Sequence, residues 1–499
     1  MNLSTVFIGH QSWMVSLKKT NILVDPVLTK SFGTSPNLRF RVYPPRVLDL
    51  NSMPNISAVV ITNEHLDHFH LDSLKLIPIG IPIIFGELMP EVCVNYAKLL
   101  GHDVHVLTTD ARFEVGELTV RLYLGSDESE FWEKRVYHTY IQPITGDRGI
   151  FIQSDALVCQ RFKSFVEEGQ IAPPLVFIST NNAQIVPPGF KGTYDNLLLP
   201  ESTMNQGHFG IQILAQVVSS YLQGLPAIPH IILSGGGYIQ EPMKHPPFLL
   251  SDTQQLADLA SKLALYQKIH GLYPGQKLEF SDCEQVESSE VKWITIDKKF
   301  WLELNNLHQG KVEQLRSDWF NYPIFSEHQG DSVNKKLNVV ESFLEKMVAP
   351  LMMSKMGAAI TTLDEYLDGP IGSERFIFQF LSSNKYPIQY SLDFNKSVFE
   401  RLENVCKNPL QRYPFGVEVH LNDFYALIDG KIQIWELSTS RLRQWYLTDQ
   451  PLLSPVGFLY CFFSEQVQPE LTRKLYDYIL SRNILSSEEN IGNELSLLM

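Results

Sequence analysis

Short, continuously apolar runs recur along the first 240 residues, and each stops at polar residues or glycine. The clearest of these runs occupy residues 56–62 (ISAVVIT), 81–86 (IPIIFG), 173–180 (PPLVFIST) and 228–237 (IPHIILSGGG). Runs of this length that are rich in β-branched residues are typical of strands buried on both faces. Segments with helical spacing of apolar residues lie between them, at 89–101, 208–225 and 252–271. This alternation predicts an α/β sandwich over roughly the first 280 residues.

The pattern changes after residue 284. Residues 285–345 show no clear rhythm of strands and helices, and the segment 338–357 (NVVESFLEKMVAPLMMSKMG) predicts a helix with an apolar face. The segment 415–438 alternates and contains Asp429-Gly430, which predicts a β-hairpin. The segment 469–484 predicts a closing helix. We therefore expect two domains, residues 1–284 and an α+β domain of residues 285–499.

Composition restricts the classes of function. The chain is 44% hydrophobic and 19% charged, and its net charge is −14. An acidic surface without a dense Lys/Arg run repels phosphate backbones, so we expect no nucleic-acid partner. The five cysteines are scattered without a CxxC motif, and no apolar run reaches the roughly 18 residues of a membrane span. We expect a cytoplasmic protein with a small-molecule substrate and no membrane contact, and leave homo-oligomerisation open.

The strand at 56–62 ends in a stretch that is rich in metal-ligand residues. Within ten residues of its end the chain carries Asn63, Glu64, His65, Asp67, His68, His70 and Asp72. Imidazole and carboxylate groups that leave a buried strand can converge on one metal ion. Clustered histidines also occur on surface loops, so the spacing alone leaves a metal site and a surface loop as alternatives.

Three motifs together resemble the metallo-β-lactamase superfamily. They are Gly9-His10, Asp25-Pro26 and the segment 63–68 (NEHLDH), which match the family in order and spacing. The resemblance covers about residues 1–280 and is strongest to the branch of lactonases, phospholipase-D-type enzymes and the sialic-acid-nucleotide hydroxylase. It implies a four-layer αββα sandwich with metal ions at the open edge between two sheets. It also places His10 in the substrate pocket, and we assign His10 and Asp67 as catalytic.

The resemblance also implies a metal-ligand set, which this sequence keeps only in part. Carried over by position, the ligands are His65, Asp67, His68 and Asp155. Asn63 replaces a family histidine, Ser126 or Asp127 occupies a second histidine position, and Ser234 occupies a third. We name Asn63, Asp127, His138 and Ser234 as additional candidates. His70 and His208 are spare imidazoles. Backbone amides of the segment 234–238 (SGGGY) either bind phosphate or form a tight loop beside the site.

The remaining donors predict one or two divalent ions, iron, manganese or zinc, with an oxygen-rich set that favours iron or manganese. The first functional hypothesis is a metal-dependent hydrolase that cleaves an ester, lactone or phosphodiester with metal-activated water. One alternative is a non-haem iron oxygenase or hydroxylase on the same fold. The other alternative is a metal-free pseudoenzyme or binding protein, which the substituted ligand positions favour.

Overall fold

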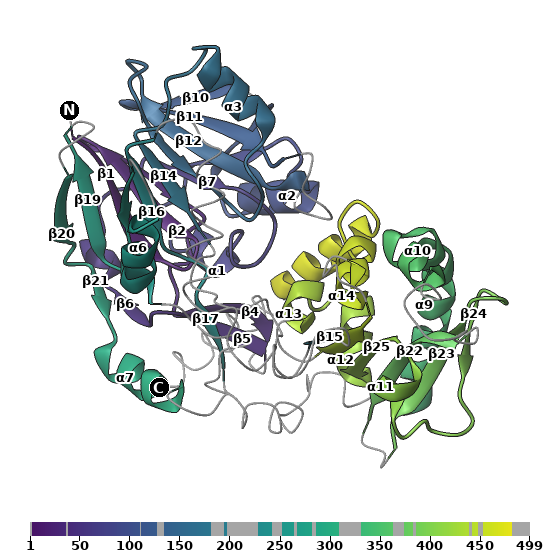
Figure 1. The fold of residues 1–499 in the computed structure, drawn as a ribbon. Helices are drawn as coiled ribbons and strands as arrows, with labels where there is room; N and C mark the ends of the chain where they lie inside the picture. The colour runs from purple at the N-terminus through teal and green to yellow at the C-terminus, as the bar shows by residue number, and fades with distance from the viewer. Residues whose placement is uncertain are drawn as a thin grey trace, which may run out of the picture. The chain divides into compact units, whose positions relative to one another are not determined.

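The computed structural model describes residues 2–35, 38–109, 111–126, 134–180, 194–196, 228–241, 252–263, 267–281, 286–308, 331–362, 374–382, 386–438, 442–447 and 453–481. The chain divides into two compact units, whose elements are drawn in Figure 1. The first unit comprises Met1–Gly33, Arg39–Pro188 and Ser202–Lys311. The second comprises Thr34–Leu38, Gly189–Glu201 and Val312–Met499.

The first unit contains an eight-stranded sheet in the order β20-β19-β1-β2-β3-β7-β8-β9. Its strands are β1 (Leu3–Gly9), β2 (Ser12–Leu17), β3 (Thr20–Val24), β7 (Ala58–Ile61), β8 (Pro82–Gly86), β9 (Asp103–Leu107), β19 (Gln276–Phe280) and β20 (Val286–Glu290). The strands from β3 to β9 pair in parallel, and the others pair antiparallel. The helices α1 (Leu71–Leu74) and α2 (Glu91–Leu99) connect the parallel strands, as crossover connections require.

A seven-stranded sheet in the order β10-β11-β12-β13-β14-β16-β18 accompanies it. Its strands are β10 (Arg112–Val115), β11 (Leu118–Leu124), β12 (Tyr137–Pro143), β13 (Ile150–Ile152), β14 (Val176–Ser179), β16 (His230–Leu233) and β18 (Lys268–His270). The last four pair in parallel. The helices α3 (Gln160–Glu167) and α6 (Thr253–Ser261) belong to this half of the unit.

The core has the layers that the sequence predicts. One cluster of buried side chains joins the two sheets and includes Phe7 and Trp13 from the first sheet and Val120 and Ile232 from the second. A separate cluster packs α3 and α6 against the other face of the second sheet. Because α1 and α2 connect strands of the first sheet and bury their apolar faces, the predicted four-layer αββα sandwich is confirmed for the N-terminal half.

The carboxyl ends of several parallel strands meet at one edge of this sandwich. Asp25 follows β3, Thr62 follows β7, and Ser154 lies two residues after β13. The Thr62 and Ser154 hydroxyl oxygens are 2.9 Å apart, so the two sheets contact each other at this edge. Ligands of α/β folds bind at such carboxyl ends.

Smaller elements belong mostly to the first unit, and only Thr34, Ser35 and Leu38 of β4 and β5 are assigned to the second. A three-stranded sheet has the order β17-β5-β4, and a two-stranded sheet pairs β21 with β6. Their bounds, with the remaining helical elements, are β4 (Ser31–Ser35), β5 (Leu38–Val42), β6 (Arg46–Leu48), β17 (Tyr238–Glu241), β21 (Ile294–Ile296), the 3₁₀ turn η1 (Leu50–Ser52) and α7 (Lys298–His308).

The second unit contains a six-stranded mixed sheet in the order β15-β26-β25-β22-β23-β24. Its strands are β15 (Tyr194–Asn196), β22 (Glu374–Leu381), β23 (Ile388–Asp393), β24 (Val398–Arg401), β25 (Phe415–His420) and β26 (Leu442–Tyr446). Its helices are α9 (Val333–Met353), α10 (Lys355–Thr361), α11 (Pro409–Arg412), α12 (Leu421–Ile428), α13 (Ile434–Ser438), α14 (Pro455–Phe462) and a helix over residues 469–481.

Two elements differ from their prediction. The hairpin predicted at Asp429-Gly430 is wrong, because α12 ends there and Gly430, with φ of 73°, follows the helix as its terminating glycine. The helix predicted over 252–271 is too long, since α6 ends at Ser261 and Lys268–His270 form the strand β18. The helix predicted at 208–225 lies outside the described residues. The domain boundary at 284/285 stays a prediction.

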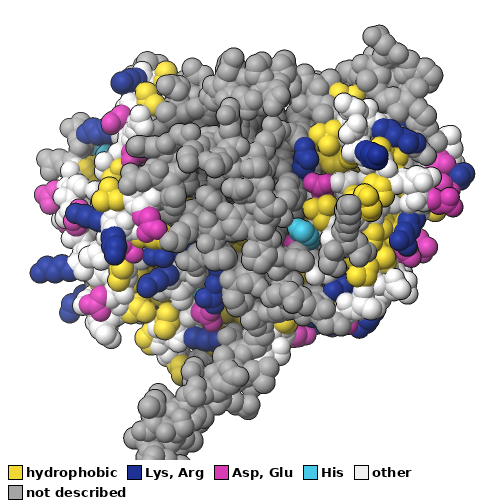
Figure 2. All heavy atoms as spheres, turned by 90° about the horizontal axis from the view of Figure 1, so that it is seen from below, with side chains coloured by type: hydrophobic (Ala, Val, Ile, Leu, Met, Phe, Trp, Pro, Cys, Tyr) yellow, Lys and Arg dark blue, Asp and Glu magenta, His cyan; other side chains and the backbone are white. Residues whose placement is uncertain are grey.

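Charged side chains of both signs are intermixed over the described surface that Figure 2 shows. No helix among the described residues combines the length and the apolar character that crossing a membrane requires.

Candidate metal centre

The segment that follows β7 brings its polar side chains to the carboxyl edge of the sandwich. The backbone amides of His68 and Phe69 both donate to the carbonyl oxygen of His65, at 2.9 and 2.7 Å. This tight turn reverses the chain before α1 begins at Leu71. As a result Asp67 and His68 lie at the edge, within reach of residues that follow β13.

Three predicted ligands converge at this edge. One ligand atom each from Asp67, His68 and Asp155 lie within 4.8 Å of one another. His68 Nε2 is 2.7 Å from Asp155 Oδ2 and 3.6 Å from Asp67 Oδ2. Asp155 comes from a different sheet and lies 87 residues away in the chain, so the fold, not local sequence, assembles the group.

Asp25 fixes the orientation of the His68 ring. Its Oδ2 is 2.8 Å from His68 Nδ1, which leaves Nε2 facing the other carboxylates. Asp25 is itself held by Thr62, whose backbone amide donates to Oδ1 at 2.8 Å and whose hydroxyl donates to Oδ2 at 2.6 Å. A carboxylate behind a ligating histidine sets its tautomer and basicity. Asp25-Pro26 is one of the motifs that carry the family resemblance in the sequence, but the motif does not reveal the contact between Asp25 and His68.

The charges within the group stabilise each other. Burial alone would lower the pKa of His68, but the surrounding carboxylates, Asp155 foremost, raise it well above its ordinary value. Burial would raise the pKa of Asp67, yet the nearby His68 and His10 hold it well below its usual range. The carboxylates therefore favour a positive charge at this position, which the His68 imidazolium or a metal ion can supply.

The turn between β1 and β2 contacts both carboxylates. His10 Nε2 is 2.9 Å from Asp67 Oδ2, and its Nδ1 is 3.3 Å from the carbonyl oxygen of Gly237. The His10 ring also packs against Phe32, with ring centroids 4.7 Å apart. Gln11 Nε2 donates to Asp155 Oδ1 at 3.3 Å. His10 is predicted from its sequence motif, but Gln11 is not, because its amide carries no ligand signature.

The three converging residues fit a divalent metal ion. Asp67 Oδ1 is buried and has no hydrogen-bond partner among the described residues, so it is available as a ligand atom. Two carboxylates and one imidazole form an oxygen-rich set of the kind that manganese, iron and zinc accept. To hold a metal ion, His68 Nε2 would have to lose its proton.

His65 is buried near this group, but it is not one of the three residues whose ligand atoms converge. Burial lowers the pKa of its imidazole, which favours the neutral form that binds metals. The preceding Glu64 forms a buried ion pair with Arg135, at 2.5 Å between Oε1 and Nη2. A ligand role for His65 stays a prediction.

The substituted positions hydrogen-bond to the backbone. Asn63 Oδ1 accepts from the His65 amide at 3.0 Å, and Ser234 Oγ accepts from the Leu272 amide at 2.7 Å. Both ring nitrogens of His138 are engaged: Nδ1 accepts from the Ser154 amide at 3.1 Å and Nε2 donates to the Leu157 carbonyl at 3.0 Å. None of the three residues is in the converging group.

Two of the remaining candidates also hydrogen-bond within the fold, and two lie outside the described residues. The Ser126 backbone amide donates to the Leu157 carbonyl oxygen at 2.8 Å. His70 Nδ1 lies 2.7 Å from Ser73 Oγ, at the beginning of α1. Asp127 and His208 lie outside the described residues.

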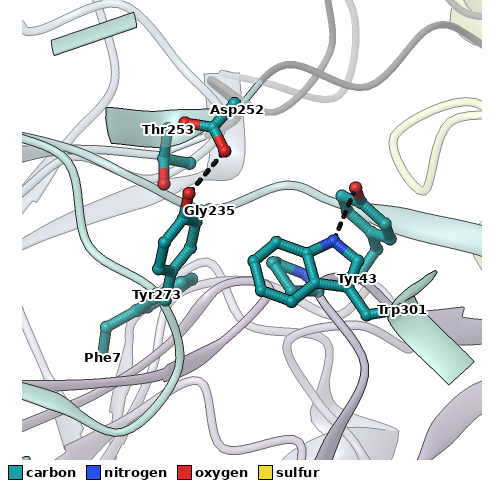
Figure 3. A pocket seen from close by; sticks show the side chains of 8 residues that line it. Phe7, Tyr43, Gly235, Asp252, Thr253, Tyr273 and Trp301 are labelled. Atoms are coloured by element: carbon teal, nitrogen blue, oxygen red, sulfur yellow. Dashed lines mark hydrogen bonds between the residues drawn. The ribbon is translucent and has the colours of Figure 1, made fainter. Parts of the chain in front are cut away.

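The glycine segment after β16 is a tight loop beside His10. A Cβ on Gly235 would lie 2.6 Å from the His10 carbonyl oxygen, and Gly236 donates its amide to that oxygen at 3.2 Å. Gly235 also borders a small pocket (Figure 3). There the Tyr273 hydroxyl donates to Asp252, and Trp301 Nε1 donates to the Tyr43 hydroxyl at 3.0 Å. The glycines thus allow the close approach of two backbones.

Comparison with protein families matches residues 5–147 to the beta-lactamase superfamily domain. No curated protein matches this chain in sequence. A possible metal-dependent hydrolase from Veillonella parvula DSM 2008 is 14% identical, with a TM-score of 0.38 over 56% of this chain and 99% of that chain. An isothiocyanate hydrolase from Delia radicum gut bacteria is 16% identical, with a TM-score of 0.38 over 56% of this chain and 100% of that chain.

A diiron β-hydroxylase from Streptomyces venezuelae is 13% identical, with a TM-score of 0.34 over 58% of this chain and 54% of that chain. The family match includes the three motifs that carry the resemblance in the sequence, from Gly9-His10 to the segment 63–68. Residues 5–147 therefore match the beta-lactamase superfamily domain, and the N-terminal half of the chain has the α/β fold of the metallo-β-lactamases.

Proposed function

We propose that the first unit is a metal-dependent hydrolase with one divalent cation held by Asp67, His68 and Asp155. The observation that carries this proposal is the convergence of three ligand atoms within 4.8 Å at the carboxyl edge of the sandwich. Two observations support it: Asp67 Oδ1 has no hydrogen-bond partner in the described part of the chain, and the Asp25 carboxylate lies behind His68. A divalent cation supplies Lewis-acid chemistry, which polarises a carbonyl or phosphoryl oxygen and makes water nucleophilic near neutral pH.

His10 holds a proton beside the reacting atoms. Its two ring nitrogens face oxygen atoms of Gly237 and Asp67, and a carbonyl oxygen can only accept. Nδ1 is therefore the donor to Gly237. The hydrogen bond between Nε2 and Asp67 Oδ2 needs a further proton, which is carried either by the imidazole or by the carboxyl group. In the proposed hydrolysis the water oxygen bonds to the carbonyl carbon or phosphorus, and the bond to the leaving oxygen breaks. His10 Nε2 would donate its proton to that leaving oxygen and regain the proton that the water loses, which makes His10 the general acid.

The substrate class follows from the resemblance in sequence, which favours a small-molecule ester, lactone or phosphodiester. Hydrolysis would be measured with a nitrophenyl ester, a simple lactone and bis(4-nitrophenyl) phosphate, after loading with Mn²⁺, Fe²⁺ or Zn²⁺. We expect metal-dependent turnover of one of them that is lost in Asp155→Asn and kept in Asp72→Asn, since Asp72 is an acid of helix α1 whose exposed side chain pairs with Lys75. Equal turnover in both variants would refute the assignment.

The second candidate function is an iron-dependent oxidation that uses dioxygen. The ligand atoms of Asp67, His68 and Asp155 favour it. One imidazole with two carboxylates is rich in oxygen, and iron(II) enzymes that activate dioxygen use two histidines and one carboxylate. His65 is the nearby imidazole that could complete such a set. Oxygen consumption by the Fe²⁺-loaded protein that disappears in His65→Ala would favour oxidation, whereas hydrolysis unaffected by dioxygen would favour the hydrolase.

A further inference from the structure

The turn between β1 and β2 has an unusual backbone that aims two side chains at the metal centre. Gly9 has φ of 124° and His10 has φ of 56°, both in the left-handed region. The pairing register of β1 with β2 shifts between Phe7 and Gly9. A Cβ on Gly9 would lie 2.8 Å from Arg46 Nε, so only glycine fits there. This irregular turn directs His10 and Gln11 to the same edge of the sandwich.

The two oxygen atoms of Asp155 have different partners as a result. Gln11 Nε2 donates to Oδ1 at 3.3 Å, whereas Oδ2 lies 2.7 Å from His68 Nε2. Gln11 is 2% exposed, so its amide is fixed among buried neighbours. One oxygen of the carboxylate therefore accepts a hydrogen bond from the turn, and the other faces the converging ligand atoms.

A neutral amide is well suited to this position. A lysine or arginine here would add a positive charge that competes with a cation for the carboxylate. The amide hydrogen bond instead restrains rotation of the carboxylate and keeps Oδ1 occupied. Groups that hydrogen-bond to a ligating carboxylate in this way orient the ligand and tune the metal.

We propose that Gln11 is a positioning residue that keeps Asp155 monodentate, with Oδ2 as its ligand atom. This inference rests on the proposed metal-binding function and deepens it, because it assigns the coordination mode to a residue outside the ligand set. Together with His10, which contacts Asp67, it makes the β1–β2 turn the element that orients both carboxylate ligands.

The test uses Co²⁺ as the probe metal in the full-length protein, since the visible spectrum of cobalt reports coordination number and geometry. Gln11→Met keeps the side-chain length and removes the donor. Gln142→Met is the matched control, because Gln142 is a buried glutamine of β12 outside the metal centre. We expect one bound Co²⁺ in the wild type, an affinity reduced at least about 10-fold in Gln11→Met with a changed spectrum, and wild-type values in Gln142→Met.

Gln11→Glu is the second variant, for the case that methionine at this position prevents folding. It keeps the shape of the side chain, adds a negative charge and replaces the donor with an acceptor, so we again expect a changed cobalt spectrum. A wild-type spectrum and affinity in a folded Gln11 variant would overturn the role of Gln11 while leaving the metal centre intact. No cobalt bound by the wild type would overturn the metal centre itself, and this inference with it.

Discussion

The candidate metal centre contrasts with the positions around it that lack the histidines expected from the family resemblance. Asp67, His68 and Asp155 converge, and each contacts a further side chain: His10, Asp25 and Gln11 respectively. At the substituted positions, Asn63 and Ser234 accept hydrogen bonds from backbone amides. The polar atoms of the first group contact one another, whereas those of the second group accept hydrogen bonds from the backbone. We call Asn63 and Ser234 the substituted half and Asp67, His68 and Asp155 the retained half. The substituted half bonds to the backbone, and the retained half has the arrangement of a candidate ligand set.

The largest effect is expected from removing a converging ligand. Asp155→Ala takes away a carboxylate that faces His68 Nε2 at 2.7 Å, so we expect the affinity for Mn²⁺ to fall at least about 100-fold, or about 3 kcal/mol. Calorimetric titration measures this directly. Asp72→Ala is the control, because Asp72 is exposed and pairs with Lys75 at 3.3 Å. A similar loss of Mn²⁺ affinity in both variants would show that Asp155 is not a specific metal ligand.

A smaller effect is expected at the residue behind the ligand. Asp25→Asn keeps the shape of the side chain but weakens its contact with His68 Nδ1 and frees the ring to choose its tautomer. We expect a 10- to 100-fold loss of metal affinity, roughly the usual effect of such partners. The same titration checks it, and an affinity within twofold of the wild type would remove Asp25 from the account.

The substituted half should affect stability and not metal binding. Asn63→Ala leaves the buried His65 amide without its acceptor and removes the contact of Asn63 Nδ2 with Thr62 Oγ1 at 3.3 Å. We expect the free energy of unfolding of the first unit to fall by about 1–2 kcal/mol, with metal affinity unchanged within about twofold. Urea unfolding of the metal-free protein measures the first quantity. A clear loss of metal affinity would make Asn63 a ligand.

The smallest effect is expected at Ser234, which makes a single hydrogen bond of this kind. Ser234→Ala removes the acceptor for the Leu272 amide, and we expect a loss of about 1 kcal/mol in urea unfolding. Ser234→His offers the family imidazole at the cost of the same hydrogen bond. Tighter metal binding by this histidine variant would show that the substituted half still has ligand geometry.

The sequence predicts the buried strands well because their apolar runs are continuous. The run at 56–62 contains β7 (Ala58–Ile61), and the run at 228–237 contains β16 (His230–Leu233). The predictions from the sequence fail where one local motif is compatible with two structures. Asp429-Gly430 is a hairpin signal, but a glycine also ends helices, and here Leu421–Ile428 is helical. Local pattern does not decide between the two.

The candidate site can be predicted from the sequence where a residue with a metal-ligand side chain directly follows a predicted strand. Asp67 and His68 follow a buried strand in a family motif, and Asp155 follows another strand, so all three could be named from the sequence. Gln11 could not, since its contact with Asp155 spans 144 residues and depends on the irregular turn at Gly9. Such contacts between distant segments exist only after folding.

The metal content of the purified protein is the most direct test of one metal ion bound by Asp67, His68 and Asp155. The protein would be purified without a histidine tag, aerobically and anaerobically, beside an Asp67→Ala, His68→Ala double variant, and both analysed by plasma mass spectrometry. We predict close to one equivalent of iron, manganese or zinc in the wild type and loss of that metal in the variant. Metal-free wild-type protein, or equal metal in both proteins, would contradict the account.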